Sequence, residues 1–354
     1  MQQRAKIHFQ PPKGWINDPN GLIFFGGQYH AFFQYNPDDM SSRKIRWGHI
    51  VSDDLLHWRQ LPSAIYPDED YDETGCWSGS ALEKDGKMYL FYTSVSEKYG
   101  QTQSVAVSDD GVNFIKYDGN PVIKKPPFPT RDFRDPKVMK TDDGYAMVLG
   151  SGEGGEGKIL LYKSDDLLEW RYEGVLFEKK AVAKVFECPD FFRLGDKYVL
   201  MFSKIAQNIN AAYFATGVFD GRKFTPQSFC EPVYGPQFFA AQTFEDDKNR
   251  RILIAWMSDW TRKPAPDDEF IGSLSIPMRV SVKDGKIFLY PVEEARGFLT
   301  TGNAAVRVEG NDIIVDGQPP VKCPVAINKI EFLSDANLLE IFVNDGEFVM
   351  SYVL

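Results

Sequence analysis

The stretch Ser52-Asp53-Asp54-Leu55-Leu56-His57-Trp58 occurs three times in this chain in related forms. It returns as Ser108-Asp109-Asp110-Gly111-Val112-Asn113-Phe114 and then as Ser164-Asp165-Asp166-Leu167-Leu168-Glu169-Trp170, at an interval of 56 residues both times. A shorter fourth copy, Asp220-Gly221-Arg222-Lys223-Phe224, follows at a similar distance. Each copy comes after a short segment of alternating apolar residues and contains an aromatic residue at its end. The pattern therefore predicts a strand, a tight acidic turn and a second strand in each repeat.

A second unit lies between these copies and consists of two apolar segments around a polar turn, which is typical of a β-hairpin. Five such hairpins alternate with the acidic-turn pairs, and no apolar periodicity of 3.6 residues is present. Five four-stranded units close most simply as an all-β, five-bladed β-propeller around a central channel. The hairpins are expected at Leu22–Phe25 with Tyr29–Gln34, Ser80–Leu82 with Met88–Tyr92, Lys137–Met139 with Tyr145–Leu149, Phe191–Arg193 with Tyr198–Phe202, and Gln242–Phe244 with Ile252–Trp256.

The last blade should end in a hairpin around Lys283-Asp284-Gly285, and Pro291 to Gly297 should form a linker. We therefore expect the propeller to occupy residues 1–297. Residues 298–354 again alternate between apolar and polar positions and contain many turn residues. Because so short a segment cannot bury a large core of its own, we expect a small β-module packed on the propeller.

Composition excludes several classes of function. The net charge is −10 and no basic cluster is long enough to follow a phosphate backbone, so nucleic-acid binding is not expected. No apolar run approaches the roughly 18 residues of a membrane span, and the first residues do not resemble a signal peptide. The four cysteines share no metal-ligand spacing and are expected to be free thiols in a cytoplasmic protein. Neither a metal nor a cofactor is expected.

In a propeller the innermost strand of each blade runs along the central channel, so the residues that start these strands converge at one mouth. Three of the five starts carry an acid, namely Asp18, Asp135 and Glu187, and a proline follows at once or after one residue. Proline keeps the preceding residues extended. We therefore expect the three acids at the same structural position. The starts are Asn17-Asp18-Pro19, Trp77-Ser78-Gly79, Arg134-Asp135-Pro136, Glu187-Cys188-Pro189-Asp190 and Gln242-Thr243.

Carboxylates crowded into one funnel repel each other and raise at least one pKa, which points to chemistry or to a metal. Glycoside hydrolysis needs two such groups, a nucleophile and an acid with a raised pKa that protonates the leaving oxygen. A third carboxylate can accept hydrogen bonds from sugar hydroxyls. Calcium is the alternative ligand, because three or four carboxylates also make a hard-cation site. The cation Arg134, next to Asp135, argues against a dedicated calcium site.

The ordered motifs of residues 5–297 resemble glycoside hydrolase family 32, which includes invertases, inulinases, levanases and sucrose-6-phosphate hydrolases. The motifs are Trp15-Ile16-Asn17-Asp18-Pro19-Asn20-Gly21, Phe33-Gln34-Tyr35-Asn36-Pro37, Trp47-Gly48-His49, Trp77-Ser78-Gly79-Ser80, Phe133-Arg134-Asp135-Pro136, Glu187-Cys188-Pro189-Asp190 and Ala240-Ala241-Gln242-Thr243-Phe244.

The resemblance implies a retaining hydrolase of terminal β-fructofuranosyl linkages in sucrose, sucrose 6-phosphate or short fructo-oligosaccharides. By this resemblance Asp18 is the nucleophile, Glu187 the acid/base and Asp135 the transition-state stabiliser. The two reacting carboxyl groups of a retaining enzyme lie roughly 5 Å apart. A buried structural role stays open for Trp77 and Trp256. The residues that match pocket positions of the family are Asn17, Gln34, Trp47, Trp77, Ser78, Arg134 and Trp256.

Three departures from the family bear on specificity and assembly. The loop Met40–Arg46 lacks the family's extra Trp-Gly and carries Arg43, Lys44 and Arg46 instead, which suggests either a phosphate site or, as we favour, a solvated loop. Gln237 stands where the family commonly has Asp, and both changes are expected to alter the leaving-group side. The family's C-terminal β-sandwich is larger than residues 298–354, so a reduced sandwich with open strand edges favours a homodimer.

Two other functions remain open. An inverting five-bladed glycosidase of the arabinan or xylan type also uses two aspartates and a glutamate, although the motifs around Asp18 and Glu187 argue against it. A propeller that binds sugars without catalysis is the second alternative, and the presence of all three acids argues against it.

Overall fold

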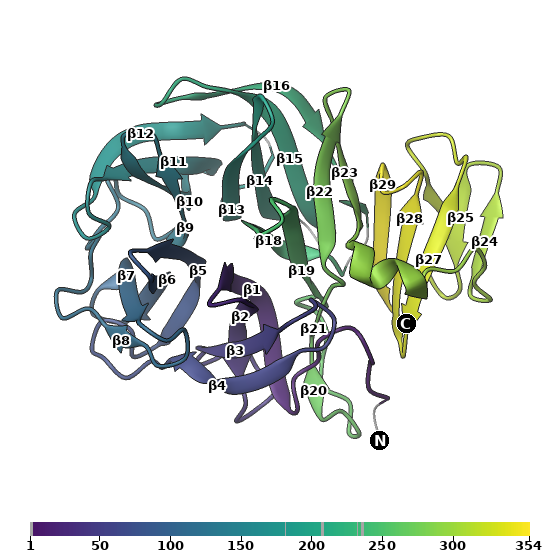
Figure 1. The fold of residues 1–354 in the computed structure, drawn as a ribbon, viewed down its shortest axis with the longest axis horizontal. Helices are drawn as coiled ribbons and strands as arrows, with labels where there is room; N and C mark the ends of the chain where they lie inside the picture. The colour runs from purple at the N-terminus through teal and green to yellow at the C-terminus, as the bar shows by residue number, and fades with distance from the viewer. Residues whose placement is uncertain (1–2, 181, 207–208, 232, 235–236) are drawn as a thin grey trace.

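The computed structural model describes residues 3–354 except 181, 207–208, 232 and 235–236. The fold is the predicted five-bladed propeller (Figure 1), and within each blade the strands follow one another in sequence order. Blade one contains β1 (Gly14–Phe25), β2 (Gln28–Asn36), β3 (Arg46–Ser52) and β4 (Arg59–Ile65), and blade two contains β5 (Gly75–Lys84), β6 (Lys87–Ser96), β7 (Gly100–Ser108) and β8 (Ile115–Lys116). Blade three contains β9 (Phe133–Thr141), β10 (Gly144–Glu153), β11 (Glu156–Ser164) and β12 (Arg171–Glu178), and blade four contains β13 (Glu187–Leu194), β14 (Lys197–Ala206), β15 (Ile209–Phe219) and β16 (Phe224–Cys230). Blade five contains β18 (Phe239–Glu245), β19 (Arg251–Met257), β22 (Met278–Lys283) and β23 (Lys286–Pro291).

Two short strands between β19 and β22 help to close the ring. β20 (Phe270–Ile271) pairs in parallel with the start of β1, and β21 (Ser273–Leu274) pairs with β19. The segment that follows the first half of blade five therefore hydrogen-bonds to blade one, so the ends of the propeller are joined through the backbone. No helix in the described part of the chain is long and apolar enough to cross a membrane.

The repeated acidic motif forms the turn between the third and fourth strands of a blade. In the first copy Asp54 Oδ1 accepts hydrogen bonds from the Ser52 hydroxyl at 3.0 Å and from the backbone N–H groups of Leu56 and His57. Asp110 and Asp166 accept equivalent bonds in the second and third copies. The motif recurs because an aspartate that satisfies two backbone donors fixes a tight turn.

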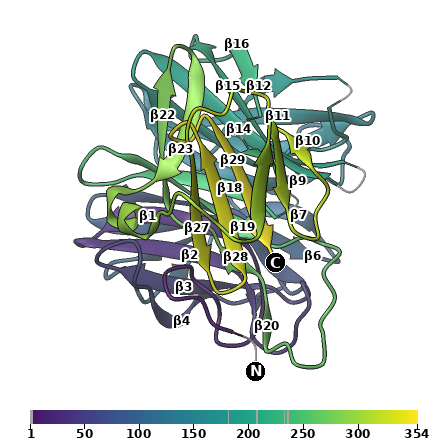
Figure 2. The ribbon, with the colours of Figure 1, turned by 90° about the vertical axis from the view of Figure 1, so that its right-hand side faces the viewer.

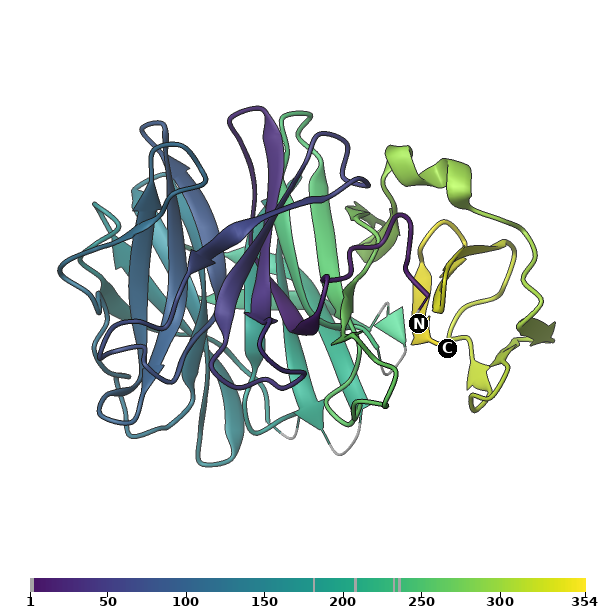
Figure 3. The same ribbon diagram turned by 90° about the horizontal axis from the view of Figure 1, so that it is seen from below.

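The C-terminal module lies beside blade five (Figures 1 to 3) and contains two small sheets. A 3-10 helix, η1 (Glu293–Phe298), occupies most of the segment Pro291–Gly297, for which the sequence predicted a linker. One sheet includes β17 (Val233–Tyr234), which comes from the propeller segment and pairs in parallel with β29. The strands are β24 (Val306–Glu309), β25 (Asp312–Val315) and β26 (Val321–Lys322) in one sheet, and β17, β27 (Ile330–Asp335), β28 (Leu338–Val343) and β29 (Phe348–Val353) in the other.

The module and the propeller share a hydrophobic core. Leu333, Phe342 and Val349 of the module belong to the same buried cluster as Ile254 and Val280 of blade five. All five side chains are almost completely buried. Because this contact removes apolar surface of both parts from water, it stabilises the module in its place on blade five.

A buried histidine ties the N-terminal arm to the module. His8 Nδ1 lies 3.1 Å from Asp335 Oδ2 and His8 Nε2 lies 3.0 Å from Glu340 Oε2. Asp335 also accepts the backbone N–H groups of Lys6, Ile7 and His8. Burial alone lowers the pKa of His8, but the hydrogen bonds to the two carboxylates outweigh it and raise the pKa to about 9.

We predict that this contact makes the free energy of unfolding fall in alkaline solution. The folded state holds the His8 proton more tightly than the unfolded chain, so the stabilisation is complete below pH 6.5 and is lost as the pH rises through about 9. The loss amounts to about 3 kcal/mol. Urea unfolding at pH 6 and pH 9.5 measures it, and His8→Asn should reduce the difference. His57→Asn, at an exposed histidine, is the control, and an equal pH effect in His8→Asn would contradict the prediction.

Candidate active site

Each innermost strand contains a bulge near its start, where the candidate residues lie. The register shifts between Ile16 and Pro19 in β1, between Trp77 and Gly79 in β5, and between Glu187 and Asp190 in β13. The same irregularity occurs in β9 and β18. A bulge leaves a residue without a ladder partner and changes the direction of its side chain. Since these five strands surround the centre of the ring (Figure 1), the bulges aim side chains into one cavity.

The backbone of the bulges corrects one expectation from the sequence. Asp135, Cys188 and Ala240 have φ angles of 63°, 48° and 52°, in the left-handed region, and occupy the same place in β9, β13 and β18. Cys188 is thus the counterpart of Asp135, and Glu187 is the counterpart of Arg134. The prediction that all three acids occupy one structural position is wrong for Glu187, because its blade has one residue between the acid and the proline.

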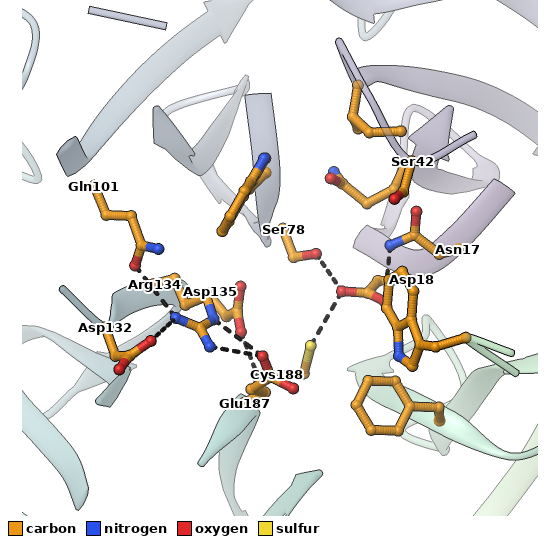
Figure 4. A pocket seen from close by; sticks show the side chains of 15 residues that line it. Asn17, Asp18, Ser42, Ser78, Gln101, Asp132, Arg134, Asp135, Glu187 and Cys188 are labelled. Atoms are coloured by element: carbon orange, nitrogen blue, oxygen red, sulfur yellow. Dashed lines mark hydrogen bonds and ion pairs between the residues drawn. The ribbon is translucent and has the colours of Figure 1, made fainter. Parts of the chain in front are cut away.

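The bulges enclose a cavity of about 380 Å³. Figure 4 shows the side chains that line it. Eight of the ten predicted site residues are among them: Asn17, Asp18, Gln34, Trp77, Ser78, Arg134, Asp135 and Glu187. The cavity is also lined by residues that the sequence did not single out as site residues: Ser42, Ile45, Gln101, Asp132, Cys188, Phe239 and Trp260.

Three donors fix the carboxylate of Asp18. Its Oδ2 accepts a hydrogen bond from the Ser78 hydroxyl at 2.5 Å and one from the Cys188 thiol at 3.3 Å. Its Oδ1 accepts from Asn17 Nδ2 at 3.0 Å, and Asn17 is itself held by the indole N–H of Trp15. The side chain is buried among residues of three blades. The carboxylate therefore has a single orientation at the wall of the cavity.

Glu187 and Arg134 form an ion pair across two adjacent blades. Arg134 Nη2 and Nε donate to Glu187 Oε1 at 2.7 and 3.2 Å, whereas Glu187 Oε2 is buried and has no hydrogen-bond partner in the described structure. Burial raises the pKa of Glu187 and the Arg134 charge partly offsets this shift. Because Oε1 is occupied by two N–H donors, a proton on Glu187 belongs on Oε2.

Asp135 also lines the cavity and is held by two hydrogen bonds that involve backbone N–H groups. Its Oδ2 accepts the Cys188 N–H at 2.8 Å, and its own N–H donates to the Thr93 hydroxyl at 2.9 Å. Burial raises the pKa of Asp135 to about 7, with Arg134 lowering it and the Asp18 and Glu187 charges raising it. Near neutral pH this carboxyl group can therefore either accept or donate a hydrogen bond.

Two predicted pocket residues do not line the cavity, which corrects the expectation for them. Trp47 is completely buried and donates its indole N–H to the Trp77 carbonyl at 3.0 Å. Trp256 is also completely buried, with ring centroids 5.8 Å from Trp15 and 4.9 Å from Trp260. Both side chains pack behind the lining, because their strands place them on the core side. Trp77, in contrast, does reach the cavity.

The residues that the sequence did not reveal come from loops and from the neighbours of motif residues. Gln101 and Asp132 lie at or near the starts of β7 and β9, and both contact the Arg134 guanidinium, at 3.4 and 2.7 Å. Trp260 follows β19. Cys188 carried a sequence signal, because it lies inside the Glu-Cys-Pro-Asp motif next to a predicted acid, and Ser42 and Ile45 belong to the atypical loop Met40–Arg46.

The atypical loop Met40–Arg46 contributes Ser42 and Ile45 to the cavity but none of its cations. Arg46 Nη2 pairs with Asp38 Oδ2 at 2.6 Å, and Arg43 and Lys44 are exposed. Gln237 lines a separate small cavity and donates a weak hydrogen bond to Asp259 at 3.4 Å. Within the described residues, no group of three or more His, Cys, Asp or Glu side chains is arranged to hold a metal ion.

A polar layer lies below the acids and joins three blades. Lys137 Nζ contacts Asp190 Oδ2 at 3.0 Å and the Thr243 carbonyl at 2.5 Å. Gln242 Nε2 donates to the Cys188 carbonyl at 3.1 Å. These contacts connect the strand segments that carry Asp135 and Glu187, so they keep the two acids at a fixed separation.

Comparison with known proteins gives concordant results. A family model described as the N-terminal domain of glycosyl hydrolases family 32 matches residues 8–291. A sucrose-6-phosphate hydrolase of Zymomonas mobilis is 36% identical over 93% of this chain and 69% of the relative. A raffinose invertase of Escherichia coli is 38% identical over 81% of this chain and 64% of the relative. The chain thus spans about two thirds of the length of these curated relatives.

Solved structures agree with this similarity. A β-fructofuranosidase of Bombyx mori has a TM-score of 0.88 and 28% identity, and the match covers 99% of this chain and 89% of that chain. A sucrose-6-phosphate hydrolase of Lactobacillus gasseri has a TM-score of 0.86 and 26% identity, over 99% of this chain and 88% of that chain.

We predict that Lys137→Met destabilises the protein by about 3–5 kcal/mol, because it leaves the buried Asp190 charge without its partner. Lys140→Met on the same strand is the control, since Lys140 is largely exposed and its nearest acid oxygen is 3.8 Å away. Urea unfolding measures both variants. Adding Asp190→Asn to Lys137→Met should recover part of the loss, and equal stability of the two single variants would contradict the prediction.

Proposed function

The chain belongs to glycoside hydrolase family 32, and on this premise we propose that it hydrolyses terminal β-fructofuranosyl linkages with retention of configuration. The observation that carries the proposal is the difference between its two acids. Asp18 is fixed by three hydrogen-bond donors, as a nucleophile needs, whereas Glu187 keeps one oxygen without a partner and has a raised pKa, as a general acid needs.

In the proposed first step Asp18 attacks the anomeric carbon of the fructosyl unit and Glu187 donates the proton of Oε2 to the leaving oxygen. The glycosidic bond breaks and a covalent fructosyl–enzyme forms. In the second step Glu187 Oε2 takes a proton from water, which attacks the anomeric carbon and releases Asp18. Arg134 holds Glu187 Oε1 throughout, so the same oxygen gives and takes the proton.

Asp135 is proposed to stabilise the transition state by hydrogen bonds to ring hydroxyls. A pKa of about 7 lets the group exchange between donor and acceptor roles while charge develops on the sugar. Asn17, Gln34, Trp77 and Ser78 would hold the fructosyl unit. Trp47 and Trp256 would support this pocket from behind its lining.

We infer a propeller domain of residues 1–297 and a C-terminal module of residues 298–354, with β17 as the strand shared between them. A cytoplasmic location and a homodimer also stay predictions. The outer strands β24 and β26 of the smaller sheet have open edges that could pair with a second subunit. Sedimentation as a monomer at micromolar concentration would contradict the dimer.

The catalytic roles predict the behaviour of two isosteric variants. Asp18→Asn and Glu187→Gln should each lower kcat for sucrose by about 10³-fold or more, because each removes a group that acts in the transition state. Asp38→Asn, at an exposed acid outside the cavity, is the control. Thermal unfolding should confirm that all variants are folded. Unchanged hydrolysis by Asp18→Asn would contradict the role of Asp18 as nucleophile. No hydrolysis by the unmodified protein would support a sugar-binding propeller, and an inverted product anomer in NMR would support the arabinan or xylan type.

The ion pair predicts a pH effect. The first step needs protonated Glu187, so kcat/KM should fall on the alkaline side as this group ionises. The Arg134 charge lowers the pKa of Glu187, so Arg134→Gln should move the alkaline limb to higher pH, by about one unit or more. Arg43→Gln is the control, and a shift to lower pH in Arg134→Gln would refute the assignment.

A further inference from the structure

We propose that the leaving-group side of this cavity selects uncharged sugars over phosphorylated ones, and that Asp132 determines this specificity. The inference rests on the proposed function, because it concerns the group that departs from the fructosyl unit. Three observations support this inference: the charges of the side chains that line the cavity, the contacts of Arg134, and the position of Asp132.

The lining is rich in carboxyl groups. Among the described residues Asp18, Asp132, Asp135 and Glu187 line the cavity, and Arg134 is the single cation there. Four of the five N–H groups of the guanidinium have contacts: Nε and one N–H of Nη2 donate to Glu187, and Nη1 donates to Asp132 and Gln101. A phosphate group needs cations or several N–H donors free to contact its oxygens. A phosphate that contacts Arg134 would therefore compete with Glu187, Asp132 and Gln101 for most of its N–H groups.

Asp132 lies where the leaving group should be. Figure 4 shows Gln101 and Asp132 on the far side of the Arg134–Glu187 pair from Asp18. A nucleophile and the departing group occupy opposite sides of the anomeric carbon, and Glu187 protonates the departing oxygen. The leaving sugar therefore lies on the Glu187 side of the cavity, within reach of Asp132 and Gln101.

The carboxylate of Asp132 is held in place and still accessible. Its backbone N–H donates to the Thr130 hydroxyl at 3.1 Å, its carbonyl accepts from the Ser151 hydroxyl at 2.7 Å, and Oδ1 accepts from Arg134. Its side chain remains 38% exposed. A fixed, partly solvated carboxylate accepts hydrogen bonds from sugar hydroxyls and repels a phosphate dianion.

Arg134 apart, no cation is among the described residues that line the cavity. Arg46 is paired with Asp38, and Arg43 and Lys44 do not reach the lining. The lining also contains the partly exposed ring of Trp260, and aromatic rings pack against the apolar faces of neutral sugars. The chemistry of this side therefore fits a neutral hexosyl group.

Three substrates distinguish the effect of the charge of the leaving group from the effect of its size. Sucrose has a free glucosyl 6-hydroxyl, raffinose carries a neutral galactosyl group there, and sucrose 6-phosphate carries a phosphate at the same position. At low ionic strength we expect kcat/KM for sucrose to exceed that for sucrose 6-phosphate by about tenfold or more. Raffinose should lie much nearer to sucrose. Adding salt should narrow the gap between sucrose and its phosphate, because salt screens the repulsion.

The variant Asp132→Asn tests the assigned residue. It keeps the size and much of the hydrogen bonding of Asp132 but removes the charge, so the ratio of kcat/KM for sucrose to that for sucrose 6-phosphate should fall by about three- to tenfold. The ratio for sucrose to raffinose should stay nearly constant. Asp142→Asn, in the exposed turn at the other end of the same β9–β10 hairpin, is the matched control and should leave both ratios unchanged.

The outcomes are distinguishable. Equal or faster turnover of sucrose 6-phosphate by the unmodified protein, or an unchanged ratio in folded Asp132→Asn, would overturn the specificity proposal and leave the fructosidase proposal standing. Failure to hydrolyse any of the three β-fructosides would overturn both. A failure of Asp132→Asn to fold does not remove the test, because the comparison of the three substrates uses the unmodified protein.

Discussion

The active-site geometry depends on one backbone constraint, the bulge at the start of each innermost strand. A regular strand would direct alternate side chains into the blade packing on either side of it. The bulges instead aim neighbouring residues into the channel, and in three blades they do so with a non-glycine residue at positive φ. Such a backbone costs of order 1–3 kcal/mol per residue. Hydrogen bonds from the same residues help to offset this cost: Asp135 N–H donates to Thr93, Cys188 N–H to Asp135 and Ala240 N–H to Ser203.

The same bulges explain how several acids coexist in a small volume. The three acids do not occupy equivalent positions in their blades. Glu187 lies one residue before the counterpart of Asp135 and forms an ion pair with Arg134 of the neighbouring blade. Below them a second layer connects the blades through Lys137, Asp190 and Gln242. One cation beside the acids and one beneath them reduce the repulsion between the carboxylates, yet burial still raises the pKa values of Asp135 and Glu187. The site therefore contains two carboxyl groups with raised pKa values next to a well-oriented carboxylate.

The charge distribution also links catalysis to the choice of substrate. Because Arg134 contacts Glu187, Asp132 and Gln101, most of its N–H groups are occupied, and the acids around it give this side of the cavity an excess of negative charge. Arg134 thus controls the proton of the proposed acid through Nε and Nη2, while Nη1 contacts Asp132 and Gln101. The basic loop residues Arg43 and Lys44, for which the sequence favoured a solvated loop over a phosphate site, are exposed side chains outside the lining. Arg43 and Lys44 lie between the lining residues Ser42 and Ile45 in the sequence, but their charged groups do not reach the cavity.

The sequence by itself determined the propeller and the identity of its acids. The acidic turn repeated at 56 residues marks the blades because each turn aspartate must satisfy the same backbone donors, and strand-starting motifs place Asp18, Asp135 and Glu187 at the channel. Only the tertiary structure decided which side chains face the cavity. It put Trp47 and Trp256 behind the lining and brought Gln101, Asp132 and Trp260 into it. The physical reason is register: a bulge of one residue reverses the face on which a side chain lies, and loop residues are placed by the blades that flank them.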